Sequence, residues 1–432
     1  MSRVWRNWGR SQSVTPVERA RPQSTDEVVE IVRSAREREL RVKPVGTGHS
    51  FSGIAVAPGI QLDMSGLTGI RGADGTRVRV GSGTRLHDLS LQLVPLGLAL
   101  QNLGDIDVQT ISGATSTGTH GTGREFGGLA TTVAGATLVT GNAEVLTVSR
   151  DENADLLPAV ALGLGALGVL TELTIETVPS FVLAVDEHPE PLDLVLSEWT
   201  ERVDGADHFE FYWFPHTEFV LGRTSNRLPG DVPTTPIPAL RRWWEDSVLS
   251  NSAFTLSTNI QRAFPRWTPA INRWSIHQWN DHRFTDASYR AFVTERTLRF
   301  REMEYAIPLA EVPEVLRAIG ALIERKGWTI SFPIEVRAVA ADDLWLSTAT
   351  GRKSGYIAVH RQFHEDPTEY FQAVEEIMRA HDGRPHWGKM NWRTAEDLAP
   401  AYPRFGDFLG VRDRLDPARV FTNDYLDRVL GK

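Results

Sequence analysis

Apolar residues recur at intervals of three and four positions in five parts of the chain, the spacing that places them on one face of a helix. The first of these segments starts with a capping box, in which Ser24 is the N-cap and Glu27 follows three residues later, and it continues to about Glu39. The other predicted helices are Thr84–Val94, Pro313–Lys326, Glu369–His381 and Phe405–Leu415.

Other segments alternate apolar and polar residues, which is the period-two pattern of a half-buried strand. A clear example runs from Thr171 to Thr177 and ends at Pro179, where we place a domain boundary. Turn sequences at 73–75 and 141–143 predict two hairpins, the second within Thr132–Arg150. Further strands are predicted just before Gly46 and at Gln61–Met64, Arg77–Val80, His208–Phe214, Ile330–Val336, Leu344–Leu346 and Tyr356–His360.

Three segments lack such a pattern. Residues 1–20 are typical of an irregular arm, and residues 228–285 are rich in proline and tryptophan with little regular periodicity. The apolar run Leu156–Leu170 is interrupted by glycines and is too short to span a bilayer, so we expect it to form buried core.

Composition narrows the range of functions. The 432 residues carry a net charge of −9, without the basic footprint typical of nucleic-acid binding. The chain has no cysteine, which excludes disulfides, iron–sulfur clusters, thiolate zinc sites and thiol catalysis. The histidines lack the HExxH spacing of zinc hydrolases, so no metal site is expected. The N-terminus has no apolar h-region, so we expect no signal peptide and a bacterial cytosolic location, with peripheral membrane association left open.

Two glycine-rich stretches carry the candidate chemistry. In Arg41–Ile54, an extended run leads into Gly46-Thr47-Gly48-His49-Ser50, where glycines allow close backbone approach and free N–H groups suit a phosphate. Its glycine spacing is not the GxGxxG of a Rossmann fold, and on its own it fits a tight turn with a surface histidine better than a ligand site. The second stretch, Ile111–Gly123, consists mainly of small and hydroxyl residues that favour neither helix nor strand. We expect a loop that wraps a polar, charged ligand there, rather than a flexible linker.

Five motifs, in this order and at this spacing, resemble the flavin-dependent sugar-lactone and alditol oxidoreductases of the vanillyl-alcohol-oxidase superfamily. They are VGTGHSFSGIA (45–55), ISGATSTGTHGTG (111–123), EMEYAIP (302–308), IEVR (334–337) and HWGK (386–389). This group includes L-gulono-1,4-lactone oxidase, D-arabinono-1,4-lactone oxidase and alditol oxidase. The resemblance covers nearly the whole chain, and residues 228–285 match least.

The resemblance implies an α+β fold. A PCMH-type FAD-binding domain of two subdomains is expected at 1–178, a cap domain built on an antiparallel sheet at 179–395, and a C-terminal segment that returns to the FAD domain at 396–432. The two domains would enclose the isoalloxazine ring, which would place HWGK at their junction.

The resemblance also assigns residues to the FAD cofactor. His49 matches the family histidine that is joined covalently to the flavin 8α-methyl carbon, a bond that a nucleophilic imidazole can form and that should raise the reduction potential. The phosphate and ribityl contacts would come from Gly46, Thr47, Gly48, Ser50 and Ser52. The second stretch would line the same cofactor with Gly113, Ser116, Gly118, Thr119, His120 and Gly123, and we assign His120 no chemical role.

Glu335, Arg337 and Lys389 would form the substrate site. Glu335 and Arg337 lie two residues apart on a predicted strand, so both side chains point to one face. Spacing alone also allows a solvated face, but the resemblance favours a pocket floor that binds vicinal hydroxyls or a lactone. Lys389 would stabilise negative charge as an alkoxide or reduced flavin develops. His360 is a further candidate for substrate binding.

Gly104 matches the family position that faces the flavin, and Asp105 matches the position that follows it. A small residue there leaves space for dioxygen and favours oxidase over dehydrogenase behaviour. Asp105 stands where alditol-oxidising relatives have serine. A carboxylate at this position could accept the proton of a substrate hydroxyl, and it argues against a linear polyol as substrate.

The implied reaction transfers a hydride from a secondary alcohol of a sugar 1,4-lactone to flavin N5. The electrons then pass to O2, giving H2O2, or to another carrier. Two enzymatic alternatives are an alditol oxidase acting on xylitol or sorbitol and a dehydrogenase with an acceptor other than oxygen. A flavin-binding protein without turnover is the alternative from another class.

Overall fold

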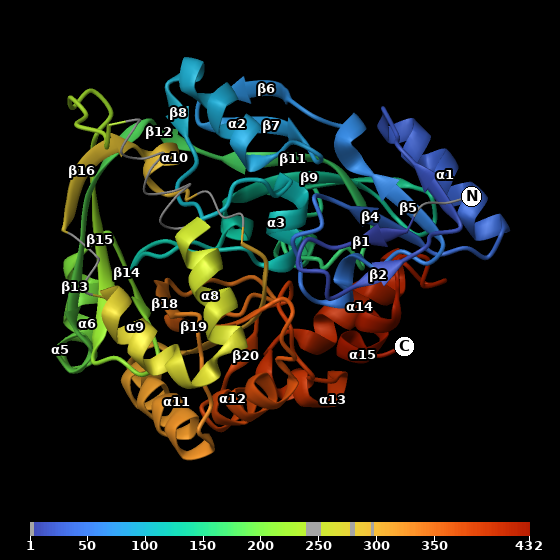
Figure 1. The fold of residues 1–432 in the computed structure, drawn as a ribbon. Helices are drawn as coiled ribbons and strands as arrows, with labels where there is room; N and C mark the ends of the chain where they lie inside the picture. Colours follow the sequence, from blue (N-terminus) through green and yellow to red (C-terminus); the bar gives the residue numbers. More distant parts are fainter. Residues whose placement is uncertain (1–3, 239–251, 277–280, 295–297) are drawn as a thin grey trace.

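The computed structural model describes residues 4–238, 252–276, 281–294 and 298–432. Figure 1 shows two sheet-containing regions side by side, one drawn from blue to teal and one from green to orange. The red C-terminal helices α14 (Phe405–Leu415) and α15 (Asp424–Leu430) return to the blue region and share its core. Among the residues that the structure describes, no helix has the length and apolar character needed to cross a bilayer.

The N-terminal region begins with a small three-stranded parallel sheet in the order β3-β5-β4, covered by helix α1 (Thr25–Glu37). Ser24 caps α1 by accepting a hydrogen bond from the N–H of Glu27, as the capping box predicted. The apolar stripe of α1 packs on this sheet together with Phe421 from the C-terminal segment. The strands are β3 (Glu18–Ala20), β4 (Val42–Val45) and β5 (Ile60–Asp63).

A five-stranded antiparallel sheet in the order β10-β9-β11-β7-β6 follows. Both predicted hairpins are confirmed, and β11 alternates buried and half-buried residues along its whole length. The strands are β6 (Ile70–Asp74), β7 (Arg77–Gly81), β9 (Val133–Val139), β10 (Val145–Ser149) and β11 (Val169–Glu176). Helices α2 (Leu86–Leu93), α3 (Ile111–Thr117) and α4 (Leu157–Val160) contribute to the same core, as do α13 (Ala395–Leu398), α14 (Phe405–Leu415) and α15 (Asp424–Leu430).

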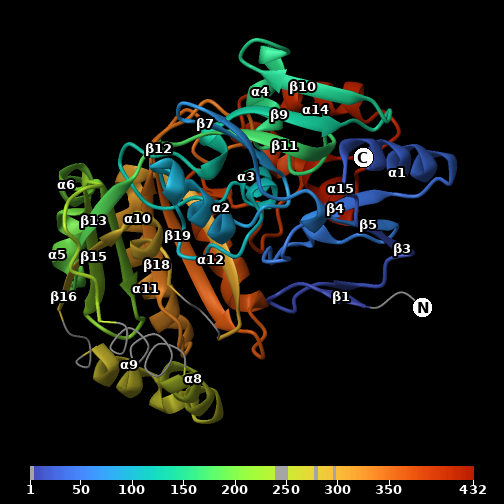
Figure 2. The same cartoon turned by 90° about the horizontal axis from the view of Figure 1, so that it is seen from above.

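The second region is built on an eight-stranded sheet in the order β16-β13-β15-β14-β18-β19-β17-β20, and all its strand pairs are antiparallel. Helices α5 (Leu192–Ser197), α6 (Trp199–Gly205), α11 (Val312–Lys326) and α12 (Thr368–Ala380) bury their apolar faces against one side of it. Figure 1 shows α5 and α6 at the left and α11 and α12 along the lower margin of the molecule, away from the blue N-terminal region, and Figure 2 gives the view from above. The strands are β13 (Phe181–Pro191), β14 (His208–Trp213), β15 (Phe219–Pro229), β16 (His282–Ala287), β17 (Phe300–Pro308), β18 (Ile334–Val339), β19 (Ser354–Gln362) and β20 (Arg384–Pro385).

The prediction that residues 111–123 form a loop throughout is wrong, because Ile111–Thr117 forms α3. Thr110 caps this helix by accepting from the N–H of Gly113, and Thr115 and Thr117 donate to carbonyls four residues earlier. Gly118 ends the helix in the left-handed conformation. Local side-chain hydrogen bonds and burial of Ile111 therefore override the low helix propensity of the segment.

Three other predictions need correction. Residues 344–346 form a turn rather than a strand, because Asp342 accepts hydrogen bonds from the N–H of Leu344 and the hydroxyl of Ser347. The irregular arm at 1–20 contains three short strands, β1 (Trp5–Arg6), β2 (Ser13–Val14) and β3. The described part of 228–285 contains two helices, α8 (Phe254–Ala263) and α9 (Thr268–Ile276), besides the end of β15 and most of β16. Residues 239–251 and 277–280 lie outside the described residues.

Candidate active site

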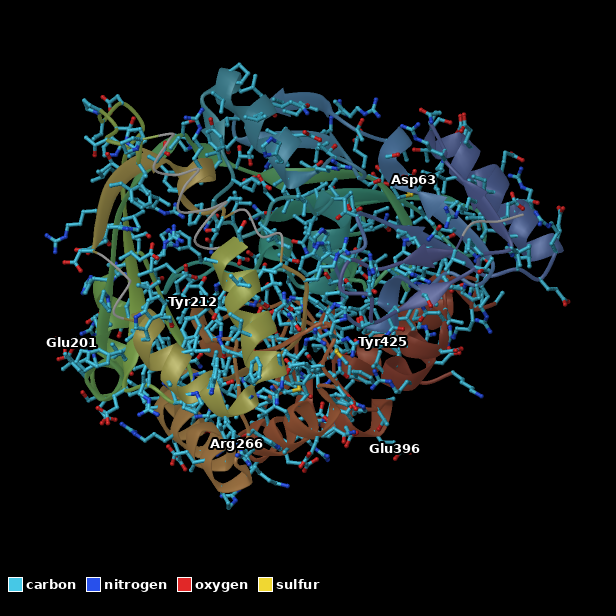
Figure 3. All side chains as sticks on the ribbon, in the orientation of Figure 1. Asp63, Glu201, Tyr212, Arg266, Glu396 and Tyr425 are labelled. Atoms are coloured by element: carbon cyan, nitrogen blue, oxygen red, sulfur yellow. The ribbon has the colours of Figure 1, made fainter. Side chains whose placement is uncertain are left out.

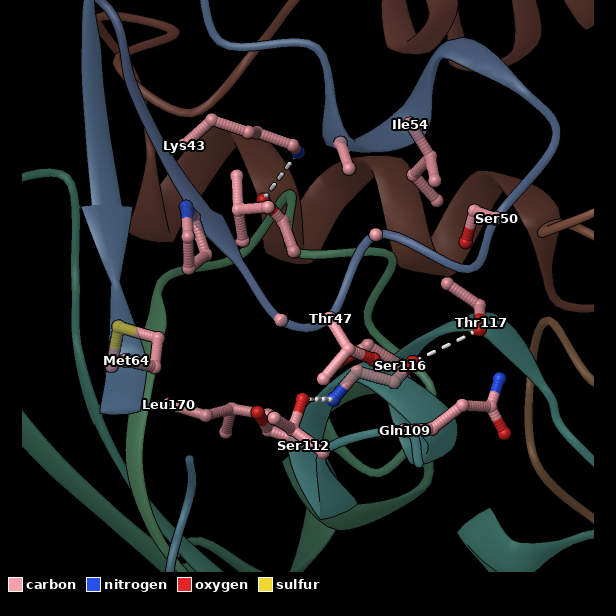
Figure 4. Close-up of a pocket in the computed structure, with 18 of the residues that line it drawn as sticks. Lys43, Thr47, Ser50, Ile54, Met64, Gln109, Ser112, Ser116, Thr117 and Leu170 are labelled. Carbon is pink, nitrogen blue, oxygen red and sulfur yellow. Dashed lines mark hydrogen bonds between the residues drawn. The ribbon is translucent and has the colours of Figure 1, made fainter. Parts of the chain in front are cut away.

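A pocket lies between the loop that follows β4 and the helix α3 (Figure 4). The empty space in and around it is about 760 Å³, a figure that includes space open to solvent. Of the predicted cofactor residues, seven line it: Gly46, Thr47, Gly48, His49, Ser50, Gly113 and Ser116.

Small residues are required where the loop meets α3. A Cβ atom on Gly46 would lie 2.4 Å from the hydroxyl oxygen of Thr110, the N-cap of α3. Gly48 has a φ of +75°, which disfavours any residue with a side chain. The glycines therefore let two polypeptide segments approach closely and present backbone groups and hydroxyls to a narrow pocket, an arrangement that fits the diphosphate and ribityl parts of a dinucleotide.

Lys43 also lines this pocket (Figure 4). Its ammonium donates to the carbonyl oxygens of Gly165 at 3.0 Å, Phe421 at 3.2 Å and Leu164 at 3.4 Å. Burial, with a smaller contribution from Arg412, lowers the pKa of Lys43 to about 7. One side chain thus ties the strand before the loop to the C-terminal segment.

His49 follows Gly48 in the loop, and its ring stacks on the ring of Trp8 with the two ring centres 5.3 Å apart. Burial lowers the pKa of His49 to about 4, and the nearby ammonium of Lys389 acts in the same direction. The imidazole is therefore neutral near pH 7, which is the nucleophilic form.

The side of the eight-stranded sheet that faces the N-terminal region is polar. On β18, Glu335 and Arg337 alternate with residues that pack on the outer helices, so both side chains share the inner face, as their spacing predicted. Glu302 and Glu304 occupy the same face of β17, because Met303 and Tyr305 belong to the outer core. Charged groups at this density inside a protein need mutual pairing.

Arg337 is the centre of the first ion-pair group. Its guanidinium contacts the carboxylates of Glu335, of Glu210 at 2.7 Å and of Asp105 at 3.8 Å. Burial alone would lower the pKa of Arg337, but Glu335 and Glu210 raise it well above its ordinary value. Burial alone would raise the pKa of Glu210, but Arg337 and Arg223 lower it. Arg337 and Glu210 are therefore both charged near neutral pH.

Lys389 is the centre of the second group and joins the two regions. Its ammonium pairs with Glu302 and lies 5.4 Å from the ring centre of Phe51, two residues beyond His49. Burial opposes the charge on Lys389, but Glu302 and Glu304 raise its pKa above the ordinary value. The second oxygen of Glu302 is 3.7 Å from Nε2 of His360, which places His360 in this group as well.

His120, Glu304 and His386 place side-chain ligand atoms within 4.8 Å of one another, a spacing that a metal ion could use. Nδ1 of His386 accepts a hydrogen bond from the N–H of Gly388 at 3.0 Å, so the proton of the neutral ring is on Nε2. Neither nitrogen of His386 is then open to a metal. Nε2 of His120 lies 3.3 Å from Glu304, so this histidine links a glycine-rich segment to the polar face of the sheet.

The HWGK motif lies against the His49 loop. The carbonyl of Gly388 accepts from the N–H groups of Phe51 and Ser52, and the hydroxyl of Ser52 donates to the carbonyl of Trp387 at 2.8 Å. Tyr425 of α15, labelled in Figure 3, donates to the same carbonyl of Trp387. The backbone carbonyls of Trp387 and Gly388 thus join the loop, the motif and the C-terminal helix, through donors from both backbone and side chains.

Several residues assigned to the cofactor lie outside the lining of the pocket. Ser52 bonds to Trp387, and the N–H of Gly123 donates to the carbonyl of Ala338 on β18 at 2.7 Å. The hydroxyl of Thr119 accepts from Gln109, which does line the pocket. The complete set outside the lining is Ser52, Gly104, Gly118, Thr119, His120 and Gly123.

Sequence reasoning assigned no role to Glu210, Glu302, Glu304 or Lys43. For Glu302 and Glu304 a signal was present: EMEYAIP alternates charged and apolar residues in the way that IEVR does. Glu210 lies in HFEFYWF, where aromatic residues on both sides conceal the alternation. The sequence around Lys43 carries no such signal, because an exposed lysine in a strand would have the same kinds of neighbouring residues.

Comparison with known proteins supports one family over the whole chain. Residues 173–429 match the family model described as D-arabinono-1,4-lactone oxidase, and residues 18–149 match a model described as FAD binding domain. The L-gulono-1,4-lactone dehydrogenase of Mycobacterium tuberculosis is 42% identical over 100% of both chains. The L-gulonolactone oxidase of Bos taurus is 33% identical over 98% of both chains.

The fold is shared with solved structures. Cholesterol oxidase from Brevibacterium sterolicum aligns with a TM-score of 0.83 at 19% identity, covering 100% of this chain and 97% of that chain. This likeness confirms the predicted α+β class, with an FAD-binding region beside a cap on an antiparallel sheet. The chain therefore belongs to the D-arabinono-1,4-lactone oxidase family of FAD-binding oxidoreductases.

Proposed function

We propose that this protein oxidises a sugar 1,4-lactone of the L-gulono or D-arabinono type, with FAD bonded covalently to His49. The main support is the position of Lys389, whose ammonium lies between the polar face of the cap sheet and the loop that carries His49. The names of the most similar relatives, lactone dehydrogenase and lactone oxidase, agree with this substrate class.

The pocket between the loop and α3 would hold the diphosphate and ribityl parts of FAD, with contacts from Gly46, Gly48, Ser50 and Ser116. The neutral imidazole of His49 would be the side chain that holds the flavin covalently, through its 8α-methyl carbon. Bound in this way, FAD supplies the hydride acceptor and passes the electrons to a second substrate.

The charged groups would orient the lactone. The guanidinium of Arg337 can donate to the lactone carbonyl or ring oxygen, and Glu335 can accept from a vicinal hydroxyl. The ammonium of Lys389 would stabilise negative charge as the reacting hydroxyl loses its proton, and a carboxylate oxygen of Asp105 would receive that proton. These groups hold one another in place before the substrate enters, so positioning supplies much of the rate.

We further propose that O2 is the acceptor of the electrons, because Gly104 leaves space beside the position expected for the flavin. A Cβ atom there would lie 3.0 Å from the carbonyl oxygen of His120. A dehydrogenase that uses an electron carrier is the alternative, in line with the name of the Mycobacterium relative.

The deciding experiment is anaerobic mixing of the purified flavoprotein with L-gulono-1,4-lactone, D-arabinono-1,4-lactone, xylitol and sorbitol, followed by flavin absorbance. Bleaching by a lactone and not by an alditol is expected. Bleaching by alditols alone would instead indicate an alditol oxidase. If no compound bleaches the flavin, the enzymatic interpretation fails. Mixing the reduced protein with O2 or with cytochrome c then identifies the type of acceptor.

A further inference from the structure

His120 and Glu304 form a buried contact in which both ring nitrogens of the histidine face oxygen atoms. Nδ1 lies 2.8 Å from the carbonyl oxygen of Gly121, and Nε2 lies 3.3 Å from a carboxylate oxygen of Glu304. The two side chains are only 3% and 6% exposed, so bulk water cannot replace either partner. In the described part of the chain, one other histidine–carboxylate contact is buried to a similar degree. It joins His360 to Glu302 at 3.7 Å, beyond hydrogen-bond distance.

A neutral imidazole cannot satisfy both contacts of His120. It carries one N–H, and its other ring nitrogen presents a lone pair, which would face either the carbonyl of Gly121 or the carboxylate of Glu304. Two electron-rich atoms would then face each other in a buried place, where an unsatisfied acceptor is costly. With N–H groups at both nitrogens, the imidazolium satisfies both contacts.

The proton of this pair belongs on the ring and not on the carboxylate. Burial alone would raise the pKa of Glu304, but the charges of His120 and Lys389 lower it below its ordinary value. Lys389 itself pairs directly with Glu302 on the same strand. The positive charge in contact with Glu304 is therefore that of His120.

The other titratable groups that pack against His120 cannot replace its charge. Its ring lies on that of Tyr356 with centres 3.8 Å apart, and burial raises the pKa of this phenol. The ring of His386 is 5.8 Å away, and burial lowers its pKa to about 4. Both groups are therefore neutral near neutral pH.

The charges around Lys389 show what the pair does for the site. Glu302 and Glu304 both act on Lys389 and raise its pKa. One ammonium with two carboxylates has a net negative charge, and such a site would oppose the development of further negative charge. The imidazolium of His120 balances Glu304, so that Lys389 and Glu302 remain as a neutral pair. The ammonium can then stabilise a developing anion.

We propose that His120 is a positioning residue, an imidazolium that balances Glu304 and so makes the charge of Lys389 effective at the reacting atoms. It acts through Glu304 and Lys389. The proposal rests on the function proposed above, in which Lys389 stabilises negative charge during oxidation of the lactone.

The first test is NMR spectroscopy of the flavin-loaded, full-length protein with ¹⁵N-labelled histidine. The variant His120→Gln identifies the signals of this ring by their absence. Near neutral pH, both ring nitrogens of His120 should have the chemical shifts of protonated nitrogen. In Glu304→Gln the ring should be neutral with its proton on Nδ1, because the new amide can donate to Nε2. A neutral ring in the unmodified protein would overturn the proposal.

The second test removes the charges one at a time. His120→Gln keeps an N–H that can reach Glu304 but leaves the site one charge more negative. Flavin reduction by the lactone should slow about tenfold, the size expected for one unbalanced charge in a partly desolvated site. The midpoint potential of the flavin should fall as well, because reduction adds negative charge. The double variant His120→Gln/Glu304→Gln lacks both charges and should recover most of the rate and of the potential.

His381→Gln is the matched control. Nδ1 of His381 lies 2.8 Å from Glu311, and both residues flank the outer helices α12 and α11, so this replacement should change neither rate nor potential. A merely structural role for His120 predicts that the double variant is slower than the single one, and that result would contradict the proposal.

The outcomes separate this proposal from the proposed function. If no lactone reduces the flavin, the function fails, while NMR and the midpoint potential still decide the charge of His120 because they need no substrate. A neutral His120 in a protein that oxidises the lactone would overturn this proposal alone. If His120→Gln does not fold, comparing the unmodified protein with Glu304→Gln still shows whether one ring loses a proton.

Discussion

At the scale of single residues, Lys389 pairs with Glu302 on the cap sheet and lies over Phe51 beside the His49 loop. Replacing it by Met keeps much of the volume and removes the charge. We expect flavin reduction by the lactone to slow about 10²–10³-fold, because the developing negative charge loses its nearest cation. Stopped-flow absorbance under anaerobic conditions measures this rate.

Flavin content should change little in Lys389→Met, and equal losses of flavin and of reduction rate would contradict a catalytic role. Lys353→Met is the matched control. Lys353 is half-exposed and lies 3.9 Å from Glu125 at the surface, so its replacement should leave the reduction rate unaltered.

At His49 we predict a covalent bond between the imidazole and the flavin. Because burial and Lys389 keep its imidazole neutral well below pH 6.5, the attacking form should be fully present throughout the neutral range. Protein denatured in acid should retain yellow flavin, whereas His49→Ala should release all of it. A colourless precipitate from fully loaded unmodified protein would show that FAD is held without a covalent bond.

Gly104 tests the choice of electron acceptor. In Gly104→Ala, the added methyl group meets the carbonyl of His120 at 3.0 Å and fills space beside the expected flavin position. Reoxidation of the reduced flavin by O2 should slow selectively, while reduction by the lactone continues. Gly406→Ala on α14 is the control, because an added Cβ there meets nothing within 4 Å. Unchanged oxygen reactivity in Gly104→Ala would remove the reason for proposing an oxidase.

At the scale of elements, α3 shows how a segment with poor helix propensity becomes a helix. Thr110→Ala removes the N-cap hydroxyl and should lower the free energy of unfolding by about 1 kcal/mol. It should also weaken FAD binding, because Thr110 packs against Gly46 in the loop. FAD affinity is measured in a His49→Ala background, where the cofactor can dissociate.

Thr394→Ala removes the equivalent N-cap of α13, and Thr394 does not line the pocket. It should cost a similar amount of stability without changing FAD affinity. If both variants weaken FAD binding equally, the effect is one of general stability and not of the pocket.

The polar face of the cap sheet shows both the strength and the limit of pattern reasoning. Glu335 and Arg337 were placed on one face correctly, because a strand repeats every two residues whatever lies beside it. The pairing of Arg337 with Glu210 could not be predicted, since it depends on which strand lies next to β18. Strand order is a property of the whole sheet.

At the scale of the whole molecule, buried ionisable groups make stability depend on pH. Burial lowers the pKa of His208 and of His386 from 6.5 to about 4. The folded state therefore binds fewer protons than the unfolded state between these values, and the free energy of unfolding falls as the pH falls through this window. The slope should reach about 1.4 kcal/mol per pH unit for each histidine.

Urea unfolding over this range of pH measures the slope. The buried carboxylates Glu302 and Glu304 extend the loss to lower pH, because their cationic partners depress their pKa values below 4.5 despite burial. His208→Asn should flatten the slope by about one histidine's contribution. A free energy of unfolding that does not vary between pH 6.5 and 4 would contradict the assignment of neutral, buried histidines.

The distribution of sheets leads us to propose that residues 1–178 and 396–432 form the FAD-binding unit and residues 179–395 form the cap. The eight-stranded sheet is confined to the second of these ranges, and α13, α14 and α15 share the core of the first. The C-terminal segment is attached by Asn423, whose amide donates to the carbonyls of Gly53, Ile54 and Val56 in the His49 loop.

The sequence by itself determined the elements with strong periodicity, the glycine-rich loop with His49, and the shared face of Glu335 and Arg337, because each follows from local spacing. The tertiary structure decided which segments that are distant in the sequence come into contact. It buried Ile111 and so completed the helix Ile111–Thr117, whose capping and hydroxyl hydrogen bonds are local, and it placed Lys389 between Glu302 and Phe51. The contacts of Lys389 join residues far apart in the chain, and local patterns carry no record of them.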